Sequence, residues 1–170
     1  MLRRNIVLSL IPDRIILSLA TLGSIGTKLP APGTFGSVAG LLLALLYLPF
    51  LHPLLSLALS ILLMFFAVSI CHEAEIRIGK RDPGEIILDE AVAMPFVFIG
   101  ILPLSSGSPA WPHLLTGFLL FRFFDILKPL GINRLQKLPG GEGIVYDDIA
   151  AAIAASIVLH LLVVFKLLPG

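Results

Sequence analysis

Five acidic residues stand at positions where a carboxylate could do chemistry in an otherwise apolar chain. They are the adjacent pairs Asp89–Glu90 and Asp147–Asp148, together with Asp125. Each lies at or inside the end of an apolar segment, where a carboxylate without a partner is energetically costly. If these acids meet, they repel one another and require cations to neutralise them. An all-oxygen set with no cysteine and no well-placed histidine predicts Mg²⁺ or a similar hard cation.

Basic residues beside these acids could hold a phosphate group. Arg122, Asp125 and Lys128 follow one another at intervals of three residues, which places them near one stripe of a helix. The cations Arg122, Lys128 and Arg134 could therefore bind phosphate oxygens. The alternative is a set of structural ion pairs, Arg122 with Asp125 and Lys128 with Asp147.

Residues 30–37, which are rich in glycine and proline, are a second candidate for phosphate binding. At a helix N-terminus, Thr34, Gly36 and Ser37 would offer backbone N–H groups and two hydroxyl groups to an anion. The segment has no Walker lysine and no strand before it. The alternative is a helix start followed by a packing face at Gly36 and Gly40.

Two further features border the same charged region. Residues 140–143 include three glycines and precede the Asp147–Asp148 pair, so they predict either a flexible lid or a tight turn. His72 is an additional site candidate, because it borders the charged face next to Glu73.

Charge-free stretches predict the helices that must position these residues. No Asp, Glu, Lys or Arg occurs in residues 29–72, 91–121 or 149–165. Stretches of this length are typical of transmembrane helices, and prolines divide the first two stretches. We therefore expect helices over about 36–48, 54–74, 87–102, 112–127 and 147–167, with a break at residues 103–111.

The composition also indicates a membrane protein. Of 170 residues, 57% are apolar and only 14% are charged, and the formal net charge of +1 argues against a nucleic-acid partner. The single cysteine excludes an intrachain disulfide. We expect one all-α domain over residues 1–170. It would be a small multi-helix integral membrane bundle over about 30–168, preceded by an interfacial segment over about 1–27.

Short loops require successive helices to alternate in direction, which sorts the loops between two faces. One face collects residues 28–35, 75–86 and 128–146. From Lys28 onward, Lys166 is the one charged residue assigned to the other face. Because the charged face carries nearly all of the Lys and Arg, we expect it to be cytoplasmic. The sequence thus predicts a multi-pass protein with its polar site at the cytoplasmic helix ends.

Four ordered segments, 30–37, 82–90, 121–129 and 140–149, resemble the phosphatidylglycerophosphatase A family. The resemblance covers about residues 30–155. It implies a Mg²⁺-dependent phosphatase of the bacterial inner membrane that converts phosphatidylglycerophosphate to phosphatidylglycerol in phospholipid biosynthesis. The family pattern transfers to Asp89, Glu90, Arg122, Asp125, Lys128, Asp147 and Asp148, and also to Thr34 and Asp82.

The expected reaction is metal-assisted hydrolysis of a phosphomonoester. All five carboxylates would bind the metal, and the residues expected to be catalytic are Asp89, Arg122, Asp125 and Lys128. Direct attack by water is favoured, with Asp125 left open as a nucleophile. The expected partners are the phospholipid substrate and the membrane, and the oligomeric state stays open.

Two other functions fit parts of the pattern. A cation-binding transport or channel subunit would need acids near the middle of the bilayer, whereas these acids gather at one edge. An alcohol phosphotransferase that acts on lipid headgroups would also use Mg²⁺. Release of free phosphate would separate this second alternative from a phosphatase.

Overall fold

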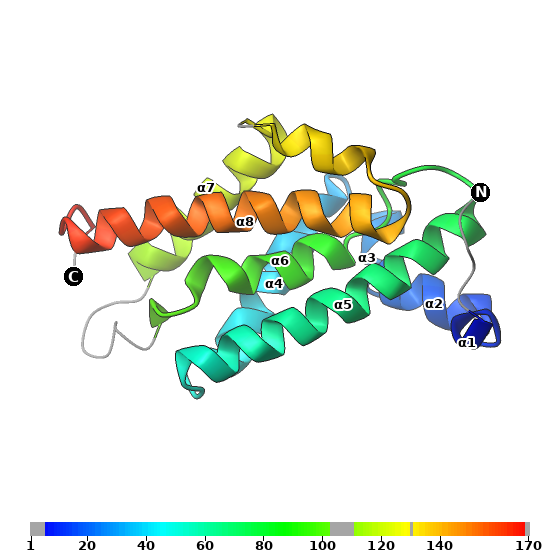
Figure 1. Ribbon diagram of the computed structural model, residues 1–170, viewed down its shortest axis with the longest axis horizontal. Helices are drawn as coiled ribbons and strands as arrows, with labels where there is room; N and C mark the ends of the chain where they lie inside the picture. Colours follow the sequence, from blue (N-terminus) through cyan, green and yellow to red (C-terminus); the bar gives the residue numbers. More distant parts are fainter. Residues whose placement is uncertain (1–5, 103–110, 130, 169–170) are drawn as a thin grey trace.

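The computed structural model describes residues 6–102, 111–129 and 131–168, and these residues form helices and no strands (Figure 1). The predicted all-α class is therefore confirmed. The longer helices run side by side, and α1 and the end of α8 lie at opposite ends of the molecule. In chain order the elements are α1 (Ile6–Ser9), α2 (Asp13–Ala20), α3 (Ile25–Lys28), α4 (Pro32–Tyr47), α5 (Pro53–Ile78), α6 (Leu88–Phe98), α7 (Trp111–Leu127), the 3₁₀ helix η2 (Ile132–Lys137) and α8 (Gly141–Val164).

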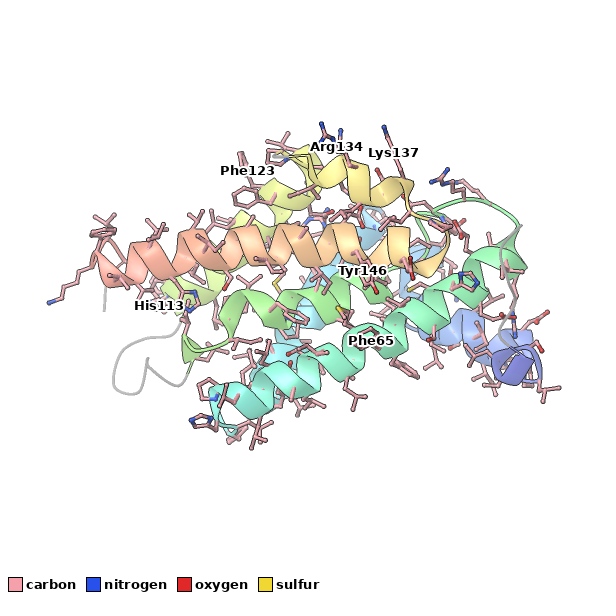
Figure 2. The ribbon with its side chains drawn as sticks, viewed as in Figure 1. Phe65, His113, Phe123, Arg134, Lys137 and Tyr146 are labelled. Carbon is pink, nitrogen blue, oxygen red and sulfur yellow. The ribbon has the colours of Figure 1, made fainter. Side chains whose placement is uncertain are left out.

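Two of these helices, α5 and α8, are long and apolar enough to cross a membrane. Large apolar side chains lie exposed along both, among them Leu62 and Phe65 on α5 and Ile157 on α8 (Figure 2). Exposed apolar surface on this scale is unfavourable in water and favourable against lipid. The fold is therefore suited to association with a membrane.

Helix α6 lies at the centre of the bundle and contacts α4, α5, α7 and α8. Its side chains from Ala93 to Phe98 are mostly buried. The contact with α4 depends on small residues, because a Cβ atom added at Gly40 would lie 2.6 Å from the Ala91 carbonyl oxygen. One added at Gly36 would lie 2.8 Å from the Ile87 carbonyl oxygen. The structure thus has the packing face that was one of the two alternatives for this segment.

Several predicted helix boundaries were wrong by a few residues. Helix α4 begins at Pro32, because a proline suits the first turn, where its missing N–H group would have no partner. Helix α5 extends past residue 74 to Ile78 and ends at Gly79, whose φ of 73° terminates the helix. Helix α6 ends at Phe98, and Gly100 then takes a φ of 84°. Of the predicted break at residues 103–111, residues 103–110 lie outside the described residues and Trp111 is the first residue of α7.

The glycines before the second acidic pair lie in a tight turn and the helix start that follows it, which matches the turn alternative. Gly140 turns the chain with a φ of 67°, and α8 starts at Gly141, six positions before the predicted start. A Cβ atom added at Gly141 would lie 1.9 Å from the Val68 carbonyl oxygen on α5. These glycines allow the backbones of α5 and α8 to approach closely.

The described part of the N-terminal segment folds as three short helices, α1, α2 and α3, with a break at residues 21–24 between α2 and α3. Arg77 of α5 holds this segment in place. Its guanidinium group lies 2.8 Å from a carboxylate oxygen of Asp13 and 3.1 Å from one of Glu73, and it donates a hydrogen bond to the Leu8 carbonyl. This side chain therefore anchors the start of the described chain on α5.

The α5–α8 contact generates a stability prediction. We expect Gly141→Ala to lower the thermal unfolding midpoint in detergent, because forcing a side chain into a packed contact typically costs about 1–3 kcal/mol. The matched control is Gly84→Ala, since a Cβ atom at Gly84 meets nothing within 4 Å. Equal midpoints for the two variants would contradict the proposed close packing of α5 and α8.

Candidate active site

The two acidic pairs lie near the starts of two neighbouring helices. Asp89 and Glu90 occupy the first turn of α6, where the positive end of the helix dipole favours carboxylates. Asp147 and Asp148 lie in the second turn of α8, which packs directly against α6. These two helix starts bring both pairs to the same end of the bundle, although they are far apart in sequence.

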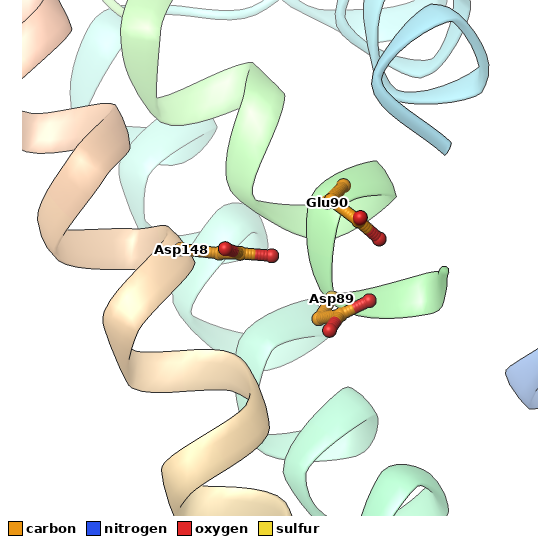
Figure 3. A group of neighbouring side chains, drawn as sticks. All are labelled: Asp89, Glu90 and Asp148. Atoms are coloured by element: carbon orange, nitrogen blue, oxygen red, sulfur yellow. The ribbon is translucent and has the colours of Figure 1, made fainter. Parts of the chain in front are cut away.

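Three of these side chains, Asp89, Glu90 and Asp148, form what we term the carboxylate trio (Figure 3). One oxygen atom from each lies within 4.8 Å of the others. Asp89 is 7% exposed and Asp148 4%. Among the described residues, no Lys or Arg forms an ion pair with the trio. Likewise, Asp89 Oδ1 and Glu90 Oε2 are buried with no hydrogen-bond partner there.

Such an arrangement is unstable without additional positive charge. Burial removes the solvation of each carboxylate, and the short separation makes them repel one another. Either protons or a bound cation must compensate. The donor set consists of carboxylate oxygens, with unpaired atoms available, and it fits a hard divalent cation such as Mg²⁺.

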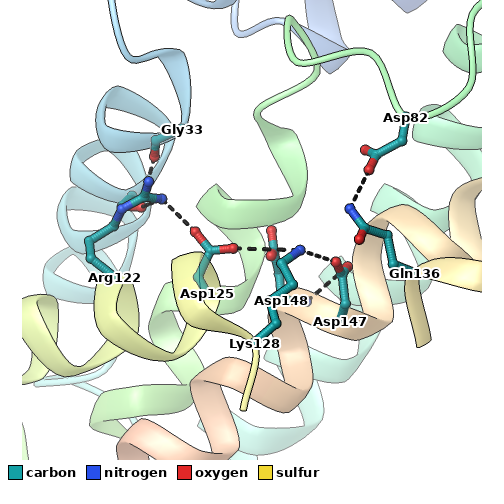
Figure 4. A network of polar contacts seen from close by, with 9 residues as sticks. Gly33, Asp82, Arg122, Asp125, Lys128, Gln136, Asp147 and Asp148 are labelled. Atoms are coloured by element: carbon teal, nitrogen blue, oxygen red, sulfur yellow. Dashed lines mark hydrogen bonds and ion pairs between the residues drawn. The ribbon is translucent and has the colours of Figure 1, made fainter. Parts of the chain in front are cut away.

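The remaining two carboxylates are held by cations (Figure 4). The Nη1 atom of Arg122 donates to Asp125 Oδ2 at 2.6 Å. The Nζ atom of Lys128 donates to a carboxylate oxygen of Asp147 and lies 3.8 Å from Asp125 Oδ1. Both ion pairs weighed as the structural alternative therefore form. The five acids divide into the trio and two residues, Asp125 and Asp147, that are paired with cations beside it.

The environment of Lys128 keeps its ammonium group protonated. Lys128 follows the last residue of α7 with a φ of 43°. Burial lowers the pKa of this ammonium group, but the hydrogen bond to Asp147 and the charges of Asp148 and Asp125 outweigh that effect, and the pKa lies above its usual value. A permanent positive charge thus stands next to the trio.

Most of the predicted phosphate loop at residues 30–37 belongs to α4, which begins at Pro32. Gly36 and Ser37 lie beyond the first turn, where backbone N–H groups are used within the helix. Thr34 donates its N–H to the Ala31 carbonyl. The Ser37 hydroxyl donates to the Gly33 carbonyl and accepts a hydrogen bond from Arg122 at 3.2 Å. Ser37 therefore connects α4 to Arg122, while the N–H groups of Gly36 and Ser37 are not available to an anion.

Gly33 belongs to the predicted phosphate loop, but the structure gives it a steric role at the site that the sequence did not predict. A Cβ atom there would lie 2.4 Å from Glu90 Oε1 and 3.2 Å from Arg122 Nη1. Any larger residue would displace one of these groups. The glycine was visible within residues 30–37, but the contact that requires it depends on how α4 packs.

Three other candidates lie outside the trio. Asp82 Oδ2 accepts a hydrogen bond from Gln136 Nε2 at 2.6 Å, which ties the segment after α5 to η2. Arg134 is exposed on η2 (Figure 2). The Nδ1 atom of His72 accepts a long hydrogen bond, 3.4 Å, from the N–H of Gly141 at the start of α8. The contact of Asp82 thus joins the segment after α5 to η2, and the contact of His72 joins α5 to α8.

Comparison with known proteins identifies relatives over most of the chain. The profile of the phosphatidylglycerophosphatase A family matches residues 18–163. A phosphatidylglycerophosphatase A of Haemophilus influenzae is 40% identical over 131 residues, 76% of this chain and 77% of the relative. The Escherichia coli protein of the same name is 31% identical over 131 residues, 76% and 72% of the two chains.

A further relative carries a different name. A putative phosphatidylinositol-3-phosphatase of Bacteroides thetaiotaomicron is 33% identical over 135 residues, covering 76% of this chain and 81% of the relative. No solved structure matches this chain.

The carboxylate trio generates a prediction about metal affinity. We expect Asp148→Asn to weaken binding of Mn²⁺, a spectroscopic substitute for Mg²⁺, at least about tenfold in the purified protein, because it removes one of three anionic donors. Titration followed by electron paramagnetic resonance would measure the affinity. The control is Glu142→Gln, which removes an exposed carboxylate in the first turn of the same helix. Unchanged affinity in Asp148→Asn would exclude the trio as the metal site.

Proposed function

The chain belongs to the phosphatidylglycerophosphatase A family, and from this we propose that it hydrolyses phosphatidylglycerophosphate to phosphatidylglycerol and phosphate, with Mg²⁺ as cofactor. It is a phosphatase by its family. The observation that supports the metal is the carboxylate trio, whose unpaired buried oxygens require positive charge. The supply of phosphatidylglycerol makes this a step of phospholipid biosynthesis.

Asp89, Glu90 and Asp148 would hold the cation. When bound, Mg²⁺ neutralises the trio and draws electron density from a phosphoryl oxygen, which makes the phosphorus more susceptible to attack. Asp125 and Asp147 were expected among the ligands as well. Their pairing with Arg122 and Lys128 favours a different role, in which they hold the two cations next to the trio.

The cations would bind the phosphate group of the substrate. The forked guanidinium of Arg122 can contact two phosphate oxygens, and the Lys128 ammonium adds a point charge. Both would stabilise the negative charge that spreads over the phosphoryl oxygens as the P–O ester bond breaks. Ser37 would help to orient Arg122 through the hydrogen bond between them.

Asp125 is the candidate for proton transfer. It lies within reach of both cations, so a bound phosphate and the attacking water would both be near it. As the water oxygen bonds to phosphorus, Asp125 would accept the water's proton, and the lipid alkoxide would take a proton from solvent water as the P–O ester bond breaks.

A position at the membrane surface suits this substrate. The site lies at the ends of α6, α7 and α8, so a lipid phosphate could reach it while its acyl chains stay in the bilayer. We place the protein in the bacterial inner membrane as a multi-pass protein. The abundance of Lys and Arg around the site favours a cytoplasmic orientation. The same position disfavours the transport alternative, which needs acids deep within the bundle.

Phosphate release by the purified protein tests the function directly. We expect free phosphate from phosphatidylglycerophosphate in detergent with Mg²⁺, and a loss of at least about a hundredfold after EDTA treatment. Phosphatidylinositol 3-phosphate serves as the comparison substrate. Faster release from that lipid would overturn the assigned substrate, and full activity in EDTA would overturn the cofactor.

The same assay tests Asp125. We expect Asp125→Asn to lose at least about 99% of turnover, because an amide cannot accept the water's proton. The variant should still insert and should elute as the wild-type protein does in size-exclusion chromatography. The Glu142→Gln control should keep full turnover. An active Asp125→Asn enzyme would remove Asp125 from the mechanism.

A further inference from the structure

A second polar site lies between the end of α5 and the start of α8. It is an open pocket of about 420 Å³, and none of its lining residues belongs to the carboxylate trio or to its paired cations. The chain reaches it from two sides, through residues 79–81 after α5 and residues 137–140 before α8. The Asp82–Gln136 hydrogen bond ties these two segments together.

Three cations line this pocket. Lys80, Arg81 and Lys137 are all exposed. Among the residues that the structure describes, neither lysine forms an ion pair, so both charges are available to an anion. Arg81 is fixed in position by hydrogen bonds from Nη2 to the carbonyls of Gln136 and Lys137, at 3.3 and 3.0 Å. The lining therefore combines two exposed ammonium groups with one anchored guanidinium group.

One buried acceptor also belongs to the pocket. Glu75 is only 5% exposed, and its Oε1 atom accepts the N–H of Asp82 at 3.0 Å. Its Oε2 atom is buried and has no hydrogen-bond partner among the described residues. A buried carboxylate oxygen without a donor is costly, and a hydroxyl group of a ligand would satisfy it. The lining thus offers cations for a phosphate and an acceptor for a hydroxyl.

The position of the pocket indicates where such a ligand comes from. Helix α5 ends at Ile78 and α8 begins at Gly141, and within the described parts of the chain these two helices are long and apolar enough to cross a bilayer. The pocket lies where these two helix ends meet, which in the proposed multi-pass arrangement is the level of the lipid headgroups. Basic pockets at such positions bind anionic lipid headgroups.

We propose that the pocket formed by Glu75, Lys80, Arg81 and Lys137 binds an anionic phospholipid headgroup that carries hydroxyl groups, at a site separate from the catalytic one. The cations would hold the phosphodiester, and Glu75 would accept a hydrogen bond from a headgroup hydroxyl. A soluble phosphate ester shares this chemistry but has no acyl chains to place it at the helix ends.

Native mass spectrometry of the full chain in detergent would count the bound lipids. We expect phosphatidylglycerol to be retained at least tenfold more than zwitterionic phosphatidylcholine. The double variant Lys80→Gln/Lys137→Gln should lower this retention about tenfold. Lys28→Gln removes an exposed lysine outside the pocket and should retain lipid as the wild type does. Both lysines of the double variant are exposed, and an unchanged thermal midpoint would verify its folding. Wild-type retention in the double variant would overturn the proposal.

Two further experiments test which ligand the pocket binds and whether it recognises headgroup hydroxyls. Inorganic phosphate and glycerol 3-phosphate at millimolar concentration should leave the lipid bound, and displacement by either would mean a site for free phosphate esters. Phosphatidylmethanol carries the same charge as phosphatidylglycerol without hydroxyl groups, so the wild type should retain it several-fold less. Glu75→Gln keeps an acceptor for Asp82 and should abolish that preference. A preference that survives in Glu75→Gln would refute hydroxyl recognition by Glu75.

Discussion

Three carboxylates gather in one small volume, two of them buried and that of Glu90 half-buried, and this is the constraint on which the rest of the structure depends. Asp89, Glu90 and Asp148 are costly together, because burial weakens their solvation and proximity adds repulsion. The fold places them at the starts of two helices and gives the nearby Asp125 and Asp147 their own cations. The positive charge that the trio still lacks must come from outside the chain, which connects the packing of the bundle to its chemistry.

Glycines make this arrangement sterically feasible. Gly33 leaves room for the Glu90 carboxylate and the Arg122 guanidinium, and Gly36 and Gly40 bring α4 against α6. On the other side, Gly141 brings α8 against α5, and Asp148 lies two turns further along. Closely packed backbones thus fix, from several directions, the helices that carry the carboxylates.

Much of this could be predicted from the sequence, because the charge-free stretches mark the helices and the spacing of Arg122, Asp125 and Lys128 places them together. Which acids share a volume could not be predicted, since that depends on the relative rotation of α6 and α8. Residues 30–37 illustrate the same limit. Glycines in this segment are compatible with either a phosphate loop or a helix packing face. The close contacts of Gly36 and Gly40 with α6 show the packing face. Arg77 contacts Asp13 and Leu8, which are distant from it in sequence. No local sequence pattern predicts these contacts.

The most direct test of the account is the position of a bound ion. Crystals of the protein grown with Mn²⁺ would show its anomalous scattering, and the account predicts one or more peaks within about 2.0–2.6 Å of oxygen atoms of Asp89, Glu90 and Asp148. Arg122 and Lys128 would flank the occupied site. Well-ordered carboxylates with no peak between them, or a peak bound by other residues, would contradict the claim that a cation resolves the repulsion of the trio.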